Sequence, residues 1–239
     1  MKEQNSRTEM LIGEKGVERL ENTHVAIFGV GGVGGYAVEA LARAGVGSID
    51  LIDSDRVSIS NINRQIIATH NTVGMYKTDA MRDRILSINP DAQVACYNFF
   101  FDESSKEKFD FSKYDYVVDA IDSLSAKVEL IASAHAAGTR IISAMGAGNK
   151  LDPTLFEVSD ISKTTVCPLA RAVRIALRKR GINHLKVVYS KEPPVITPEV
   201  SDGVKKRVPG SISFVPSAMG LIIAGEVIKD IAIDEKTEI

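Results

Sequence analysis

Cysteine is scarce in this sequence of 239 residues, which contains only Cys96 and Cys167. Two isolated cysteines cannot build the disulfide framework of a small secreted domain, and they cannot supply the two C-x-x-C pairs of a structural zinc site. The polar start MKEQNSRTE also lacks the apolar core of a secretory signal. The expected compartment is therefore a reducing cytoplasm.

Long apolar runs and an excess of one charge are missing as well. The longest apolar stretch, 221–228, contains Gly225 and Glu226 and is far shorter than the ~20 residues that cross a bilayer. The 29 basic and 31 acidic residues give a formal net charge of −2, so the composition does not indicate a polycationic protein that binds nucleic acid. A globular chain without a membrane span is expected.

Strand and helix patterns alternate along the chain, which predicts a parallel sheet. Strands are expected at 24–28, 49–52, 94–97, 116–118 and 140–143, and helices at 33–44, 77–88, 127–137 and 169–180. Gly138 and Gly181 follow the last two helices, where glycine commonly caps a helix. We predict an α/β, Rossmann-like fold with a mostly parallel central sheet, helices on both faces and a less regular insertion in the C-terminal half.

A glycine-rich loop joins the first expected strand to the first expected helix. The dinucleotide-binding fingerprint falls on Gly29, Gly31, Gly32 and Gly34. In this setting the amides at the start of the helix can meet phosphate, and Asp53, at the end of the next strand, can accept hydrogen bonds from ribose hydroxyls. The pattern indicates an adenine nucleotide. NAD enzymes share this pattern, however, and glycines that only form a tight turn beside a solvated aspartate would give the same sequence.

The chain is expected to form a single domain of four consecutive parts. These are an N-terminal helical segment (1–22), the nucleotide-binding core (23–149), a substrate-facing insertion rich in Pro and Lys (150–210), and a closing strand and helix (211–239). In the closing part the strand is expected at 211–215, and Pro216 suits the first turn of the helix.

Two positive side chains, Arg64 and Lys77, follow the second expected strand, and a dehydrogenase has no evident use for them. An enzyme that makes an acyl adenylate must bring a carboxylate onto the α-phosphate of ATP and expel pyrophosphate. The planar guanidinium of Arg64 can bind two phosphate oxygens, and the ammonium of Lys77 is a mobile point charge. Both could stabilise that anionic transition state. Taken alone, such residues are more often surface charges.

Together with their neighbours, these residues resemble the adenylating enzymes related to ubiquitin activators and to the ThiF- and MoeB-type activators of sulfur carriers. That family's pattern is G-x-G-G-x-G, D-x-D, S-N-x-x-R-Q, a downstream Lys and D-x-x-D. It matches 29–34, 53–55, 60–65, Lys77 and 119–122. The resemblance implies ATP and Mg²⁺ as cofactors and a homodimer.

The resemblance also implies roles for single residues. Besides the four glycines, the implied nucleotide-binding residues are Asp53, Asp55, Asn61, Arg64, Gln65 and Lys77. Asp53 would hold the ribose, and Gln65 would support the loop. The phosphates would be contacted by Asn61, Arg64 and Lys77. Asp122 would bind the metal, in line with the preference of Mg²⁺ for carboxylates beside phosphate oxygens, whereas Asp119 would be structural. Arg7 would reach the ATP of the partner subunit, which makes Arg7, Arg64, Lys77 and Asp122 the implied catalytic set.

Three further stretches are similar to the family of tRNA threonylcarbamoyladenosine dehydratases, and this resemblance spans nearly the whole chain. They are RTEMLIG (7–13), SAMGAGNKLDPT (143–154) and DISKT (160–164). The implied reaction adenylates the carboxylate of threonylcarbamoyladenosine beside a tRNA anticodon. A neighbouring atom of the modification then closes a ring, so that AMP and pyrophosphate leave and water is lost overall. Sulfur-transfer proteins remain open as partners.

Basic residues on the expected helix 169–180 offer a surface for tRNA. Candidates are Arg171, Arg174, Arg178, Lys179 and Arg180, with a second cluster at 205–207. A solvated helix face would have the same composition.

Several rival interpretations remain open from the sequence. The nearest is an activator of a sulfur carrier or ubiquitin-like protein. An NAD-dependent oxidoreductase and a non-catalytic nucleotide-binding module are more distant, because both leave Arg64 and Lys77 unexplained. Cys167 could be a thioester-forming nucleophile, but lone cysteines are usually inert, and Cys96 is expected in the core.

Overall fold

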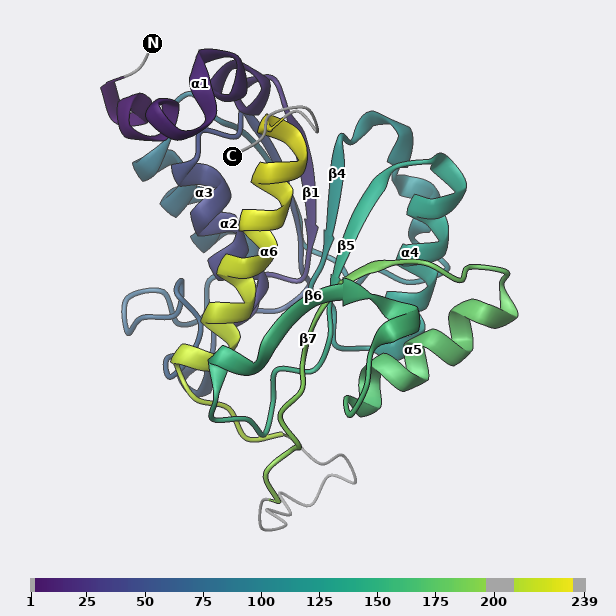
Figure 1. The fold of residues 1–239 in the computed structure, drawn as a ribbon. Coiled ribbons are helices and arrows are strands. Elements are labelled where there is room, and N and C mark those ends of the chain that lie inside the picture. Colours follow the sequence, from purple (N-terminus) through teal and green to yellow (C-terminus); the bar gives the residue numbers. More distant parts are fainter. Residues whose placement is uncertain (1–2, 197–208, 234–239) are drawn as a thin grey trace.

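Six parallel strands and one antiparallel edge strand form the central sheet of the computed structural model, which describes residues 3–196 and 209–233 (Figure 1). The order across the sheet is β3-β2-β1-β4-β5-β7-β6. The strands are β1 (His24–Phe28), β2 (Ser48–Ile52), β3 (Gln93–Tyr97), β4 (Tyr116–Asp119), β5 (Arg140–Ala144), β6 (Phe156–Asp160) and β7 (Lys186–Ser190). The predicted mostly parallel sheet is confirmed.

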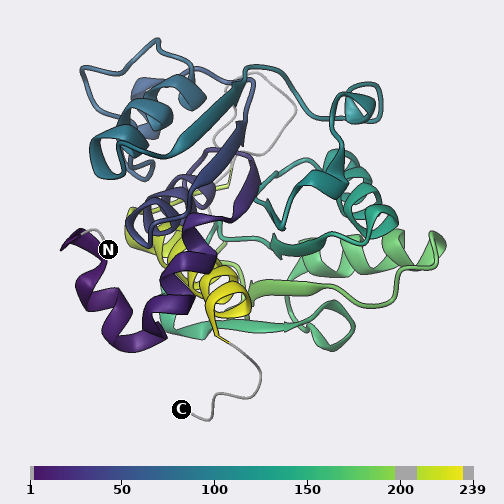
Figure 2. The same ribbon diagram turned by 90° about the horizontal axis from the view of Figure 1, so that it is seen from above.

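Helices cover both faces of this sheet, as Figures 1 and 2 show. They are α1 (Ser6–Glu21), α2 (Gly34–Arg43), α3 (Lys77–Ile88), α4 (Leu124–Ala137), α5 (Pro168–Lys179) and α6 (Phe214–Ala232). Short 3-10 helices lie at Glu3–Asn5, Ile59–Asn61, Lys106–Lys108, Phe111–Lys113, Pro153–Leu155 and Ile161–Lys163. In the two described ranges, none of the helices combines the length and apolarity needed to cross a membrane.

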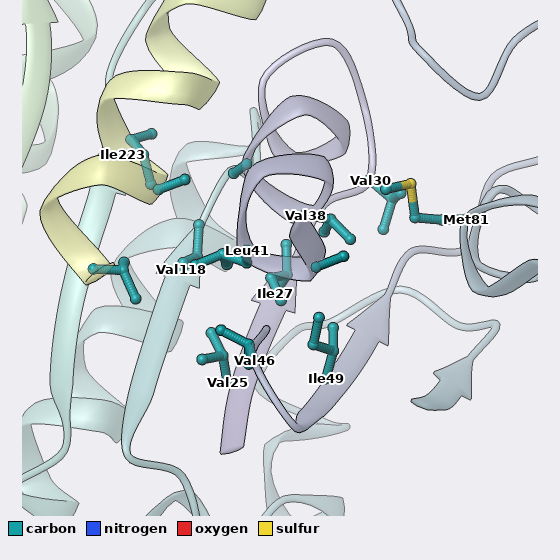
Figure 3. Packing of buried hydrophobic residues seen from close by; sticks show 14 of the residues in the cluster. Val25, Ile27, Val30, Val38, Leu41, Val46, Ile49, Met81, Val118 and Ile223 are labelled. Atoms are coloured by element: carbon teal, nitrogen blue, oxygen red, sulfur yellow. The ribbon is translucent and has the colours of Figure 1, made fainter. Parts of the chain in front are cut away.

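The alternation of side chains along β1 separates the two faces. Val25 and Ile27 belong to the cluster that packs under α2, α3 and α6, part of which Figure 3 shows. Ala26 and Phe28 point to the other face, where they meet α4 and a group of aromatic side chains from residues 97–114. Because β1 is buried on both faces, its near-continuous apolar run is typical of a central parallel strand.

The region 150–210 contributes more to the sheet than its composition suggested. The expected helix is present as α5, and Gly181 follows it with φ +76°. Two strands were missed: β7 pairs parallel with β5, and β6 pairs antiparallel with β7 at the edge of the sheet. The sequence KVVYS of β7 is too short and too ordinary to stand out among Lys and Pro residues.

The strand expected at 211–215 is wrong. Residues 211–213 form an irregular segment, and α6 begins at Phe214, so that Pro216 is the third residue of the helix. The carbonyl oxygen of Ser211 accepts a hydrogen bond from Nδ2 of Asn63 at 3.0 Å. This segment is therefore tied to a loop that follows β2 and is not paired in the sheet.

Glu39 is a buried carboxylate on α2 that joins this helix to α3. Nε of Arg84 lies 2.6 Å from Oε2 of Glu39, and Nε of Arg43 lies 2.8 Å from Oε1. Burial raises the pKa of Glu39, but the hydrogen bonds of Arg84 and Arg43 outweigh burial, so the pKa is lowered from its ordinary value of 4.5. The resulting stabilisation is present above that value and is lost as pH falls through the lowered pKa.

We therefore expect Glu39→Gln to lower the free energy of unfolding by about 1–3 kcal/mol at neutral pH. The loss of stability below about pH 4.5 should also become shallower in the variant. Urea unfolding at a series of pH values measures both effects, with the exposed Glu107→Gln as the control. An identical pH dependence in Glu39→Gln and the parent protein would contradict this role.

Candidate active site

A cavity of about 290 Å³ lies at the carboxyl ends of β1, β2, β3 and β4. Its walls come from Gly29, Gly31 and Lys77 and from residues 52–55, 99–101 and 120–122. β1 and β4 are neighbours in the sheet, and the connection that leaves β1 runs to β2 on one side, whereas the connection that leaves β4 runs to β5 on the other. Open α/β sheets bind ligands at such a point of reversal.

The glycine loop forms the floor of the cavity, and two of its glycines are sterically required. Gly29 has φ +93°, and a methyl group there would lie 2.6 Å from the carbonyl oxygen of Ala120. A methyl group on Gly34 would lie 1.8 Å from the carbonyl oxygen of Gly29. Gly31 and Gly32 have more room, and Gly31 lines the cavity, where its backbone is open to a ligand.

Asp53 holds this loop in place from the end of β2. Its Oδ2 accepts a hydrogen bond from the backbone N–H of Val30 at 2.7 Å, and its Oδ1 accepts one from the N–H of Asp55 at 2.8 Å. Burial raises the pKa of Asp53, whereas the nearby positive charge of Lys77 acts in the opposite direction. The carboxylate therefore lies in the cavity wall and also braces the glycine loop.

Lys77 reaches the cavity because the loop that follows β2 folds back on itself. The N–H of Lys77 donates to the carbonyl oxygen of Asp55 at 3.0 Å, which closes the loop at its base. The ammonium lies 2.6 Å from Oδ2 of Asp55 and 3.9 Å from Oδ2 of Asp53. Its side chain is only 7% exposed, so this cation is fixed beside two carboxylates at the cavity wall.

The S-N-x-x-R-Q segment lies next to the glycine loop but outside the cavity wall. Oδ1 of Asn61 accepts the N–H of Ser58 at 3.0 Å and so shapes the turn. Nη1 of Arg64 donates to Oδ1 of Asn63 at 2.9 Å and to a backbone oxygen of the same loop. Gln65 is buried near Gly31, and within residues 3–196 and 209–233 its Oε1 has no hydrogen-bond partner.

The two aspartates at the carboxyl end of β4, Asp119 and Asp122, have different surroundings. Asp122 is exposed and lines the cavity, whereas Asp119 is fully buried and lies 2.7 Å from the ammonium of Lys127. Across the described part of the chain, no group of three His, Cys, Asp or Glu side chains could hold a metal ion. A divalent cation at Asp122 would therefore need oxygen atoms from a bound phosphate.

Other residues singled out in the sequence lie away from the cavity. Arg7 is exposed on α1, and both free cysteines are outside the cavity wall, with Cys167 buried and Cys96 half-buried in β3. Burial raises the pKa of the Cys96 thiol. The basic cluster at 205–207 lies outside the described residues.

Helix α5 presents only part of its expected basic face. Nη1 of Arg174 bonds to Thr164 and to the carbonyl oxygen of Ile161, and Arg180 pairs with Glu129 at 2.7 Å. The side chains that remain exposed without such contacts to the described residues are Arg171, Arg178 and Lys179.

Two features of the site were missed in the sequence. Phe99, Phe100 and Phe101 form an apolar wall of the cavity beyond β3, and the aromatic triplet after a short strand was the signal that could have found them. The other is Lys127. Its burial could not be predicted from the sequence, because a lysine in a helix is usually exposed.

Comparison with known proteins gives a consistent result. The model of the ThiF family matches residues 5–238. The tRNA threonylcarbamoyladenosine dehydratase of Bacillus subtilis is 44% identical to this chain, over 98% of this chain and 96% of that protein. An adenylyltransferase and sulfurtransferase of Saccharomyces cerevisiae, UBA4, is 34% identical over 65% of this chain and 35% of its own length.

Solved structures agree with this result. The E. coli tRNA N6-threonylcarbamoyladenosine dehydratase TcdA in complex with AMP has a TM-score of 0.86 and 35% identity, covering 95% of this chain and 92% of that one. The same protein in complex with ATP gives a TM-score of 0.86 and 33% identity, covering 95% and 93%.

Proposed function

This chain belongs to the ThiF family, and on that premise we propose that it uses ATP to adenylate the carboxylate of threonylcarbamoyladenosine in tRNA and then closes a ring with loss of water. The support comes from the Bacillus subtilis relative, which is named tRNA threonylcarbamoyladenosine dehydratase and matches 98% of this chain, and from the AMP and ATP complexes of TcdA. The yeast adenylyltransferase and sulfurtransferase supports the alternative, activation of a carrier protein, less well, because it matches a smaller part of the chain.

The observation that carries the proposal is the fixed cation at the nucleotide cavity. Lys77 lies beside Asp53 in a wall that also includes the glycine loop. Asp53 is placed for a ribose and the loop for phosphate, so Lys77 lies where a triphosphate would place its negative charge. Hydride transfer does not need this cation, whereas attack of a carboxylate on the α-phosphorus does.

The reaction balances without a covalent enzyme intermediate. One carboxylate oxygen of the substrate attacks the α-phosphorus, and the bond from that phosphorus to the bridging oxygen of pyrophosphate breaks. A neighbouring atom of the modification then attacks the activated carbonyl carbon, loses its proton and expels AMP. AMP keeps the attacking oxygen, so the enzyme chiefly positions the groups and neutralises charge.

Arg64 is proposed as a second phosphate-binding cation. It lies against the glycine loop, since a methyl group on Gly32 would be 3.4 Å from its Cγ. Its guanidinium bonds within its own loop, and a bound triphosphate would compete for it with charge-assisted hydrogen bonds, which are stronger than those to neutral oxygens. In this proposal Asn61 also contacts the phosphates, and Gln65 supports the loop.

Asp122 is the residue proposed to hold Mg²⁺, together with phosphate oxygens. When bound, this ion would neutralise charge on the phosphates. We expect Asp122→Asn to raise the Mg²⁺ concentration required for half-maximal AMP formation by about tenfold, because a neutral amide is a weaker ligand for a hard cation. A Mg²⁺ titration measures the shift, and Asp110→Asn is the exposed control. Equal Mg²⁺ requirements in all three proteins would remove Asp122 from the metal site.

The remaining assignments concern partners. A homodimer is proposed in which Arg7 reaches the neighbouring subunit's ATP, and exposed apolar side chains beside it, Met10 and Leu11, would suit an interface. Arg171, Arg178 and Lys179 are proposed to contact tRNA phosphates. Sulfur-transfer proteins are additional candidate partners, and a reducing cytoplasm suits the two free thiols.

The proposed function is tested with two candidate substrates. ATP–pyrophosphate exchange is measured with tRNA that carries threonylcarbamoyladenosine and with a small carrier protein ending in Gly-Gly. Exchange with the tRNA, together with a modified nucleoside lighter by one water, is the expected result. Exchange with the carrier protein alone would favour the alternative, and reduction of a nicotinamide would contradict both.

A further inference from the structure

Lys127 lies on α4 and is fully buried. Its ammonium donates to Oδ2 of Asp119 at 2.7 Å, to the carbonyl oxygen of Ala144 at 2.9 Å and to Oγ of Ser143 at 3.2 Å. An ammonium has three donors, so each of them has a partner. The charge is therefore both neutralised and fully hydrogen-bonded inside the protein.

These contacts join the carboxyl ends of two neighbouring strands. Asp119 is the last residue of β4, Ser143 is its partner in β5, and Ala144 ends β5. Oγ of Ser143 also donates to Oδ2 of Asp119. The pairing of β4 with β5 ends at Asp119 and Ser143. Beyond these residues, the buried hydrogen bonds of Lys127 hold the two strands together on the side of the cavity.

The network reaches the cavity wall through the second oxygen of Asp119. Oδ1 of Asp119 accepts the N–H of Ile121 at 3.1 Å, and Ala120, Ile121 and Asp122 line the cavity. The N–H of Ala120 donates to the carbonyl oxygen of Phe28 at 2.8 Å, and its own carbonyl lies against Gly29. A displacement of Asp119 would therefore move the turn 120–122 against the glycine loop.

We propose that Lys127 is a positioning residue for nucleotide binding, because it fixes Asp119 and, through Asp119, the turn that carries Asp122. Stability alone does not account for its place, since well-packed apolar side chains of similar volume often replace a buried ion pair without loss. This inference rests on the proposed function only for the identity of the nucleotide. The effect on the turn is independent of it.

The test separates positioning from stability with a paired substitution. Lys127→Met leaves the Asp119 carboxylate buried without its cation and is expected to unfold readily. Lys127→Met/Asp119→Asn removes both charges, so most of the thermal stability should return. Ser143→Ala is a milder variant that keeps the ion pair and loses the hydroxyl between its partners, and Lys150→Met is the control for loss of another buried lysine.

Two readouts are used on each folded variant: the Kd of AMP without Mg²⁺, and hydrogen exchange of a peptide covering residues 120–122. We expect the double variant to bind AMP roughly tenfold more weakly and Ser143→Ala about threefold more weakly, as for loss of one or two hydrogen bonds. Exchange in the turn should be faster in both, with protection of β4 retained. Lys150→Met should match the parent protein.

Recovered stability together with parental AMP affinity and parental exchange in the double variant would show that Lys127 acts only in the core, and would overturn the proposal. If the double variant does not fold, Ser143→Ala decides by the same criteria. If the parent protein does not bind AMP, the proposed function fails, while exchange in the turn still decides whether Lys127 positions it.

Discussion

Replacing Lys77 by methionine is expected to reduce kcat for ATP-dependent AMP formation by about 100- to 1,000-fold, the usual cost of losing one preorganised charge-stabilising group. The ammonium is only 7% exposed and is held 2.6 Å from Asp55, so it meets the nucleotide with little reorganisation. Methionine keeps most of the unbranched chain and removes the ammonium, with its charge and its hydrogen-bond donors. AMP release with modified tRNA and saturating ATP is the measurement.

The fold should tolerate this change, because Asp55 is 65% exposed and can be solvated by water, and the more buried Asp53 keeps its hydrogen bonds from the N–H groups of Val30 and Asp55. Arg56→Ala is the matched control: it removes a cation from the same loop, but one that stacks on Tyr76 at 3.7 Å and does not line the cavity. Its turnover should stay within about twofold of the parent protein, as for a surface charge. Parental turnover in Lys77→Met would remove the fixed cation from the mechanism.

Gly34→Ala is expected to lower the free energy of unfolding by about 3 kcal/mol and to abolish AMP binding, because the added methyl group would overpack the loop. Its carbon would lie 1.8 Å from the carbonyl oxygen of Gly29, a backbone atom that cannot rotate away. Helix α2 and the glycine loop would have to separate. Urea unfolding and calorimetric titration with AMP measure the two losses.

The neighbouring Gly35→Ala is the control for this prediction. Its methyl group would lie 3.4 Å from Cγ2 of Ile66, which is an ordinary contact, and alanine is favoured over glycine in a helix by up to ~1 kcal/mol. Stability should therefore stay equal or rise. Similar losses at both positions would show that the loop is simply intolerant of side chains, and the close approach at Gly34 would not be the cause.

The parallel core was predictable because its central strands are buried on both faces and glycines follow helices α4 and α5. Gly138, for example, has φ +71°, the conformation that its place after a helix led us to expect. The strands β6 and β7 were not predictable in the same way. Each of these strands has only five residues and lies near an edge of the sheet, and β6 has exposed as well as buried positions. They form strands because they pair with their neighbours in the folded protein.

The candidate site was predictable where local sequence and topology agree. Asp53 and Lys77 are separated in sequence, but both follow from elements around β2, and the structure brings them to 3.9 Å. Arg64 was expected at the phosphates, yet its guanidinium forms hydrogen bonds within its own loop. A sequence motif does not specify the rotamer of a side chain. Lys127 was missed because its burial depends on the packing of α4 over β4 and β5.

The most direct test of the central claim follows one oxygen atom. Threonylcarbamoyladenosine labelled with heavy oxygen in its carboxylate is incubated, within tRNA, with this protein and ATP, and the products are examined by mass spectrometry. Attack of the carboxylate on the α-phosphorus predicts one labelled oxygen in AMP and none in pyrophosphate. Unlabelled AMP beside a fully formed ring would contradict adenylation of the carboxylate.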